Sequence, residues 1–123
     1  PDGTASSGGR RVSEISFDDF LKTDIRVGTI IRVEDYPEAR NPSYKIFVDF
    51  GQNIGERKTS AQITEHYAPE NLVGKQVAAV INFPKKQIGK FMSEILVLGF
   101  PDENGAVVLV EPNRKVPNGG RLF

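Results

Sequence analysis

Apolar and polar residues alternate along several short stretches of the chain, a period that is typical of β-strands with one buried face. In residues 24–34 every second residue is apolar or β-branched: Ile25, Val27, Thr29, Ile31 and Val33. The pattern predicts a long strand that buries this face, with Gly28 at a bend or a close approach of another backbone. Further strands are predicted over residues 44–50, 57–61, 76–83, 94–100 and 107–110, and the last residues, 116–123, are expected to add an edge pairing.

Short helices are predicted between these strands. Ser16 followed by Asp18 and Asp19 indicates a capped helix start, and the helix would present Phe17, Phe20 and Leu21 to a barrel or a partner subunit. Residues 60–67 are interpreted as one or two helical turns with Ser60 as a candidate cap, and the segment after Pro69 as another turn. This order of elements predicts an all-β fold with short helices, a five-stranded OB-fold barrel with an N-terminal helix and flanking short strands. A β-sandwich is the alternative.

Composition places the chain among single domains. Residues 1–14 are predicted to form a disordered tail, rich in Gly and Ser over most of its length, and residues 15–123 the folded domain. Sixteen basic residues balance sixteen acidic ones, so a nucleic-acid role would rest on local patches. The absence of cysteine excludes a disulfide and fits a reducing compartment. Since no apolar run is long enough to cross a bilayer, we expect a cytoplasmic protein without membrane insertion.

The connector between the two central apolar strands carries the main candidate chemistry. Its lysines are too many to bury, and its aromatic and Met side chains can stack on bases or hold apolar peptide side chains. The constellation comprises Phe83, Lys85, Lys86, Lys90, Phe91, Met92 and Ser93. The same residues fit a polypeptide or an RNA ligand, with a steep salt dependence expected only for RNA. Alternatively, the connector is a basic loop that keeps a sheet edge soluble, with Ile88 and Phe91 in the core or a dimer contact.

A second basic group is spread over the first three strands and their loops: Arg26, Arg40, Lys45, Arg57 and Lys58. Arg26, Arg32 and Arg57 would line one barrel face. Alternatively, these arginines only keep the strand surface hydrated and bind nothing, as exposed arginines on strands often do. Gln62 can read a peptide backbone or a nucleotide edge. His66 is the only histidine and, without cysteine, cannot anchor a zinc site. No nucleotide-binding or hydrolase motif is present, so neither an enzyme nor a cofactor is expected.

Three segments in order carry a family resemblance: DIRVG at 24–28, residues 67–99, and VPNGGRL at 116–122. Together they resemble the tRNA-binding domain family, whose OB-folds are fused to methionyl- and phenylalanyl-tRNA synthetases or occur as small free-standing dimers. Within that family, residues 34–51 and 59–64 are similar to the bacterial secretion chaperones of the CsaA type. Many tRNA-binding members have an acidic residue where this chain has Arg40, a departure that moves the chain toward the chaperones.

The resemblance implies a homodimer with the N-terminal helix and a barrel edge in its interface. It also implies binding of unfolded or export-bound polypeptides, with possible tRNA binding as the alternative. The hypothesised peptide-binding residues are Phe17, Phe20, Phe83, Phe91, Met92 and Gln62. The hypothesised RNA-binding residues are Arg26, Arg40, Lys45, Arg57, Lys58, Lys85, Lys86, Lys90 and Ser93. A structural domain detached from a larger synthetase is a third hypothesis.

Overall fold

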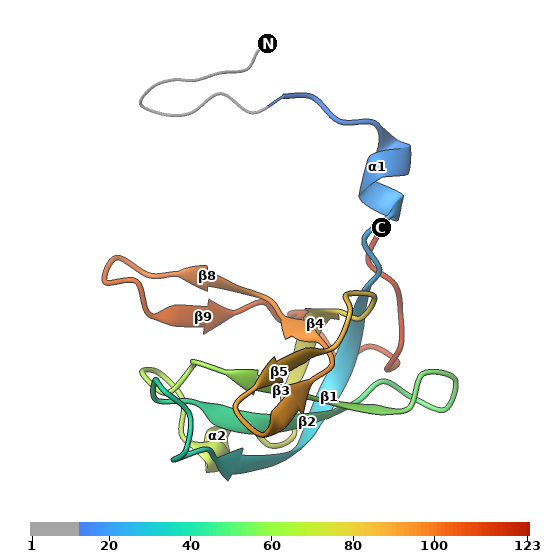
Figure 1. Cartoon of the computed structure of the whole chain (residues 1–123). Helices are drawn as coiled ribbons and strands as arrows, with labels where there is room; N and C mark the ends of the chain where they lie inside the picture. Colours follow the sequence, from blue (N-terminus) through green and yellow to red (C-terminus); the bar gives the residue numbers. More distant parts are fainter. Residues whose placement is uncertain (1–12) are drawn as a thin grey trace.

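The computed structural model describes residues 13–123, so the tail predicted over residues 1–14 lies almost wholly outside the described residues. The helices are α1 (Phe17–Leu21) and α2 (Pro69–Leu72). The strands are β1 (Ile25–Asp35), β2 (Tyr44–Asp49), β3 (Glu56–Ala61), β4 (Gln76–Val80), β5 (Lys86–Ile88), β6 (Phe91–Ser93), β7 (Leu96–Val97), β8 (Gly99–Pro101) and β9 (Val107–Leu109). Figure 1 shows β1 to β4 curling around a common centre, with the β8–β9 hairpin reaching out to one side and α1 projecting from one end.

Five strands form a nearly closed antiparallel barrel in the order β3-β2-β1-β4-β7. Two hairpins, β5–β6 and β8–β9, are attached to it as separate two-stranded sheets. The barrel confirms the predicted OB-fold, with its N-terminal helix and flanking short strands, over the sandwich. Its interior is filled by large side chains with no exposed surface, among them Ile30, Ile46, Val48, Leu72 and Val77.

The predicted buried face of β1 is wrong for Ile25, Val27 and Ile31, and right for Val33. Ile30 is fully buried whereas Ile31 is 44% exposed, because a β-bulge lies between Ile30 and Arg32. Before the bulge, the even-numbered residues of β1 face the core. After the bulge, the odd-numbered Val33 faces the core, opposite Ile46. The close backbone approach expected at Gly28 is present, since a Cβ there would lie 2.6 Å from Val48 Cγ1.

Three other predictions change in detail. Residues 60–67 do not form a helix: Ser60 and Ala61 end β3, paired with Lys45 and Tyr44, so the ladder overrides the local capping pattern. The strand predicted over 76–83 ends at Val80. The strand predicted over 94–100 is split, because Leu96–Val97 pairs with β4 and Gly99–Pro101 with β9.

The last residues extend the barrel along β1, as the sequence predicted. β2 pairs with β1 only as far as Thr29, and the chain from Gly119 onward takes its place beside the first residues of β1. The Gly119 N–H donates to the Val27 carbonyl at 2.8 Å and the Leu122 N–H to the Ile25 carbonyl at 2.8 Å. Among residues 13–123, no helix has the length and apolar character needed to span a bilayer.

Candidate binding surfaces

The outer face of β1, β2 and β3 carries a row of cations over aromatic rings. Strand pairing sets Arg32 opposite Phe47 and Phe47 opposite Lys58, and directly paired residues share a face of the sheet. Phe91 of β6 and Tyr36, which follows β1, pack beside Phe47. We call this surface the cationic shelf, and it consists of Arg32, Lys45 and Lys58 above Tyr36, Phe47 and Phe91.

The rings of the shelf are covered by its own cations. The Arg32 guanidinium lies 3.8 Å from the centroid of the Phe47 ring, and the Lys58 ammonium lies 5.0 Å from that of Phe91. Lys45 stands over two rings, 4.8 Å from Tyr36 and 5.3 Å from Phe91. Phe47 and Phe91 are each only 9% exposed. The shelf therefore presents positive charge held by ring faces rather than free rings on which a base could stack.

The β5–β6 hairpin brings the predicted connector residues beside the shelf. Lys85, Lys86, Lys90 and Met92 are all exposed, and the Lys85 ammonium lies 3.7 Å from the Glu94 carboxylate. The sequence pattern predicts no strands within this connector, so the antiparallel β5–β6 pair is a finding of the structure.

Ser93, a predicted RNA contact, has a structural environment. Its side chain is buried, lies 2.8 Å from Thr59 Oγ1, and accepts the Ser60 backbone N–H at 2.9 Å. These bonds fasten the hairpin to β3.

The remaining basic residues of the prediction do not join the shelf as one group. Arg26 has the parity of the core-facing residues before the bulge, so it lies on the opposite face of β1 from Arg32. Its guanidinium donates to the Asp24 carboxylate at 2.6 Å and to the Gly119 carbonyl at 2.9 Å. The bond from Arg26 to the Asp24 carboxylate lowers the pKa of Asp24. Arg57 pairs with the buried Val48 and therefore lies across β3 from Lys58. Arg40 is exposed in the loop after β1.

The predicted peptide-binding residues fall into separate places. Phe17 is 66% exposed and contacts Phe20, with ring centroids 6.1 Å apart, and α1 has no buried residue. Phe83 is 53% exposed in the loop after β4, which is tied to α1 because Asn82 donates to the Lys22 carbonyl at 2.8 Å. Gln62 is exposed beyond β3 and Met92 on β6, while Phe91 is buried under the shelf.

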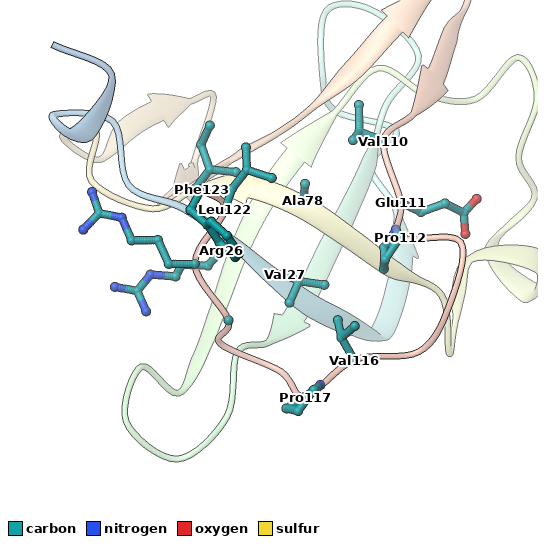
Figure 2. Close-up of a pocket in the computed structure, with 13 residues that line it drawn as sticks. Arg26, Val27, Ala78, Val110, Glu111, Pro112, Val116, Pro117, Leu122 and Phe123 are labelled. Carbon is teal, nitrogen blue, oxygen red and sulfur yellow. The ribbon is translucent and has the colours of Figure 1, made fainter. Parts of the chain in front are cut away.

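An apolar groove lies on the outer face of β1 and β4, on the opposite side of these strands from the core. It has a volume of about 460 Å³, and Figure 2 shows its walls. Ile25 and Val27 of β1, Ala78 of β4 and Val116 form much of its lining. Further walls are provided by Arg26, Val110, Glu111, Pro112, Pro117, Gly120, Arg121, Leu122 and Phe123. The odd-numbered apolar residues at the start of β1 therefore line an external groove, which the alternation alone assigned to the core.

Sequence reasoning missed the role of Tyr36 and Phe47 in the shelf. Phe47 sits between Ile46 and Val48, both fully buried, so its parity puts it on the outer face of β2 beside Lys45. An aromatic residue on the polar face of a strand with a lysine two positions away is the signal that would have pointed to it. Tyr36 had no such signal, because its hydroxyl acceptor, Ile88, and its ring neighbour Phe91 lie on β5 and β6, far along the chain.

Residues 25–121 match the family model described as "Putative tRNA binding domain". The chain belongs to this tRNA-binding domain family. Two solved structures are similar over almost the whole chain and place it with the CsaA type, as the sequence resemblance predicted. The CsaA chaperone of Bacillus anthracis is 46% identical with a TM-score of 0.84, covering 90% of this chain and 100% of that one. The CsaA chaperone of Picrophilus torridus is 45% identical with a TM-score of 0.83, covering 89% and 100%.

Curated relatives include synthetases. The methionine–tRNA ligase of Porphyromonas gingivalis is 38% identical over 109 residues, which are 89% of this chain. The match spans only 16% of that ligase, so the similarity concerns one part of a much longer protein.

Proposed function

We propose that this protein is a non-catalytic binding module, a homodimeric chaperone for unfolded or export-bound polypeptides. The observation that carries the proposal is the set of exposed apolar side chains on α1 and the loop after β4, next to an apolar groove. A small soluble domain rarely leaves such surface uncovered without a partner. The likeness to CsaA chaperones over the full length of those chains supports the same function.

The homodimer would form between α1 of one copy and the groove of the other. Ile15 and Phe17 are 69% and 66% exposed, and no residue of α1 is buried in the described part of the chain. α1 is joined to β1 just before Ile25, which lines the groove, and the Arg121 guanidinium donates to the Leu21 carbonyl at 2.6 Å. Because α1 lies next to the edge of the groove, a two-fold axis at this edge would let α1 of each copy fill the groove of the other copy.

The polypeptide would bind to the apolar side chains that remain accessible, with Phe83 and Met92 as the contacts to test first. A permanently unfolded polypeptide is titrated into the protein and the heat of binding is measured. Replacing both side chains, Phe83→Ser with Met92→Ser, should weaken binding about tenfold or more, since each loses apolar area from a contact. Binding should change little between low and high salt.

Val73→Ser is the matched control, because Val73 is 51% exposed at the end of α2, outside the proposed surface. Its affinity should equal that of the unmodified protein. No heat with any unfolded polypeptide would refute the chaperone function. Equal losses from Val73→Ser and from the double replacement would refute the assignment to Phe83 and Met92.

RNA binding is the second candidate, and the cationic shelf favours it. Lys45 and Lys58 form a positive surface beside Arg32, which is ion-paired with Glu34, and the lysines of β5–β6 extend it. Such a surface suits the phosphates of a folded RNA such as tRNA, with affinity that falls as salt rises. Lys58→Ala should weaken tRNA binding and flatten its salt dependence, while Lys115→Ala, an exposed lysine in another part of the chain, should do neither. tRNA binding that is absent or insensitive to salt would exclude this candidate.

A further inference from the structure

A hollow opens at the edge of the cationic shelf, between the loop after β1 and the turn of the β5–β6 hairpin. It is lined by Tyr36, Glu38, Lys45, Gly89, Lys90 and Phe91. Its residues come from segments about 50 positions apart in the chain, so no local sequence pattern predicts the hollow. Two ammonium groups and one carboxylate are the charged groups of this lining.

The two lysines are available to an external anion. Within the described part of the chain, the ion pairs involve neither Lys45 nor Lys90. Lys45 is half-buried, and the ring faces of Tyr36 and Phe91 fix the direction of its ammonium group. Lys90 is exposed in the hairpin turn. A cation held over two rings and an exposed cation therefore line the same hollow.

Tyr36 joins the two walls of the hollow. Its hydroxyl donates to the Ile88 carbonyl on the hairpin, and its ring packs on Phe91 at 5.7 Å between centroids. Gly89 has a φ of 63°, and a Cβ there would lie 2.6 Å from the Tyr36 hydroxyl. The hairpin turn can therefore approach Tyr36 so closely only with glycine at this position.

We propose that this hollow binds a backbone phosphate of RNA, with Lys45 and Lys90 as its cations and Tyr36 as the residue that positions them. The proposal rests on the RNA-binding candidate function and names the site where that function anchors the ligand. The buried rings give a base nothing to stack on. The cations continue from the hollow to Lys58, which matches the repeated charges of a polyanion better than one isolated carboxylate; Arg32 beyond it is ion-paired with Glu34.

The test compares tRNA binding by four variants over a range of KCl concentrations, with fluorescence anisotropy as the readout. Lys45→Gln, which keeps the aliphatic stem, and Lys90→Ala should each reduce the log–log salt slope by about 0.7–0.9. Each should also weaken binding about tenfold, as for the loss of one charge-assisted contact. Lys115→Ala, the control, should leave both quantities unchanged.

Tyr36→Phe separates positioning from charge. It removes the bond to Ile88 but keeps every cation, so affinity should fall severalfold while the salt slope stays at its original value. A Tyr36→Phe protein with unchanged affinity would overturn the positioning role. Circular dichroism verifies that each variant is folded.

The remaining outcomes distinguish a failure of the proposed phosphate site from a failure of the RNA-binding function itself. If the unmodified protein binds no tRNA, the RNA-binding function and its site both fail. If it binds tRNA with a salt slope that Lys45→Gln and Lys90→Ala leave unchanged, RNA binding stands and the hollow is not its phosphate site. If these two replacements weaken only the binding of an acidic unfolded polypeptide, the occupant is that polypeptide and the proposal is overturned.

Discussion

Lys58 and Glu94 complete the barrel through a reciprocal pair of hydrogen bonds. The Glu94 backbone N–H donates to the Lys58 carbonyl at 2.8 Å, and the Lys58 backbone N–H donates to the Glu94 carboxylate at 3.0 Å. β3 is the edge strand of the five-stranded sheet, so these groups stand where a further ladder would begin. The Glu94 side chain thus accepts a β3 backbone N–H that a further strand would otherwise pair.

Glu94→Ala should destabilise the protein by about 1–2 kcal/mol, because the Lys58 N–H loses its acceptor at a partly buried position. Glu94→Gln keeps an oxygen acceptor and should cost less than about 0.5 kcal/mol. Urea unfolding of the variants measures the difference. Equal losses in the two variants would mean that the charge of Glu94, facing Lys85, matters more than the bond to β3.

Gly28→Ala should destabilise the protein by about 1–3 kcal/mol through overpacking. The new Cβ would lie 2.6 Å from Val48 Cγ1 and 2.8 Å from the Phe50 ring, both fixed in the core. Gly120→Ala is a suitable comparison, since its Cβ would lie 3.6 Å from the nearest atom, the Pro117 carbonyl oxygen. Thermal unfolding should separate the two variants, and equal midpoints would contradict the tight approach at Gly28.

Asp24→Asn should destabilise the protein by about 1 kcal/mol at pH 7, because it removes the negative charge that pairs with Arg26. The hydrogen bond from Arg26 lowers the pKa of Asp24 below 3.8 in the folded protein. The stabilisation is therefore complete above the unfolded pKa and is lost as the pH falls through the lower, folded value. Urea unfolding at pH 7 and at pH values below 3.8 should show the variant approaching the unmodified protein in acid.

Glu65→Gln serves as the control for that pH series, because Glu65 is an exposed carboxylate outside the ion pairs of residues 13–123. It should follow the unmodified protein at every pH. A gap for Asp24→Asn that stays constant down to acid pH would contradict the link between stability and the charge of Asp24.

The double replacement Phe17→Ser and Leu21→Ser should turn a homodimer into monomers. Both side chains are exposed on α1 in the single chain, so the change removes apolar contacts between copies without opening the core. Sedimentation velocity at several protein concentrations measures the shift, and circular dichroism should be unchanged. A double variant that stays dimeric would place the interface elsewhere, and an unmodified protein that is monomeric would refute the homodimer.

Much of the fold could be read from local pattern. The first three strands, the start of the fourth and the cap at Ser16 follow from residues within a few positions of one another, and Asp19 does reach back to the Ser16 N–H at 3.3 Å. The helix expected at Ser60 does not form because Ser60 pairs with Lys45 in the β2–β3 ladder, and its N–H donates to the hydroxyl of Ser93, 33 positions away. The candidate site was only partly predictable for the same reason, since Lys45, Lys58 and Phe91 were named but Tyr36 and Phe47 were not.

The sequence by itself determined a β-barrel of the tRNA-binding family with a basic connector between two of its strands, because alternation, turn residues and motif order are all encoded along the chain. Only the tertiary structure decided which face each residue serves. The bulge before Arg32 reverses the parity of β1, and it leaves Ile25 and Val27 to line a groove outside the core. It was likewise packing between distant segments that buried Phe91 beneath the lysines, since the free energy of burying a ring depends on neighbours that its own stretch of sequence does not contain.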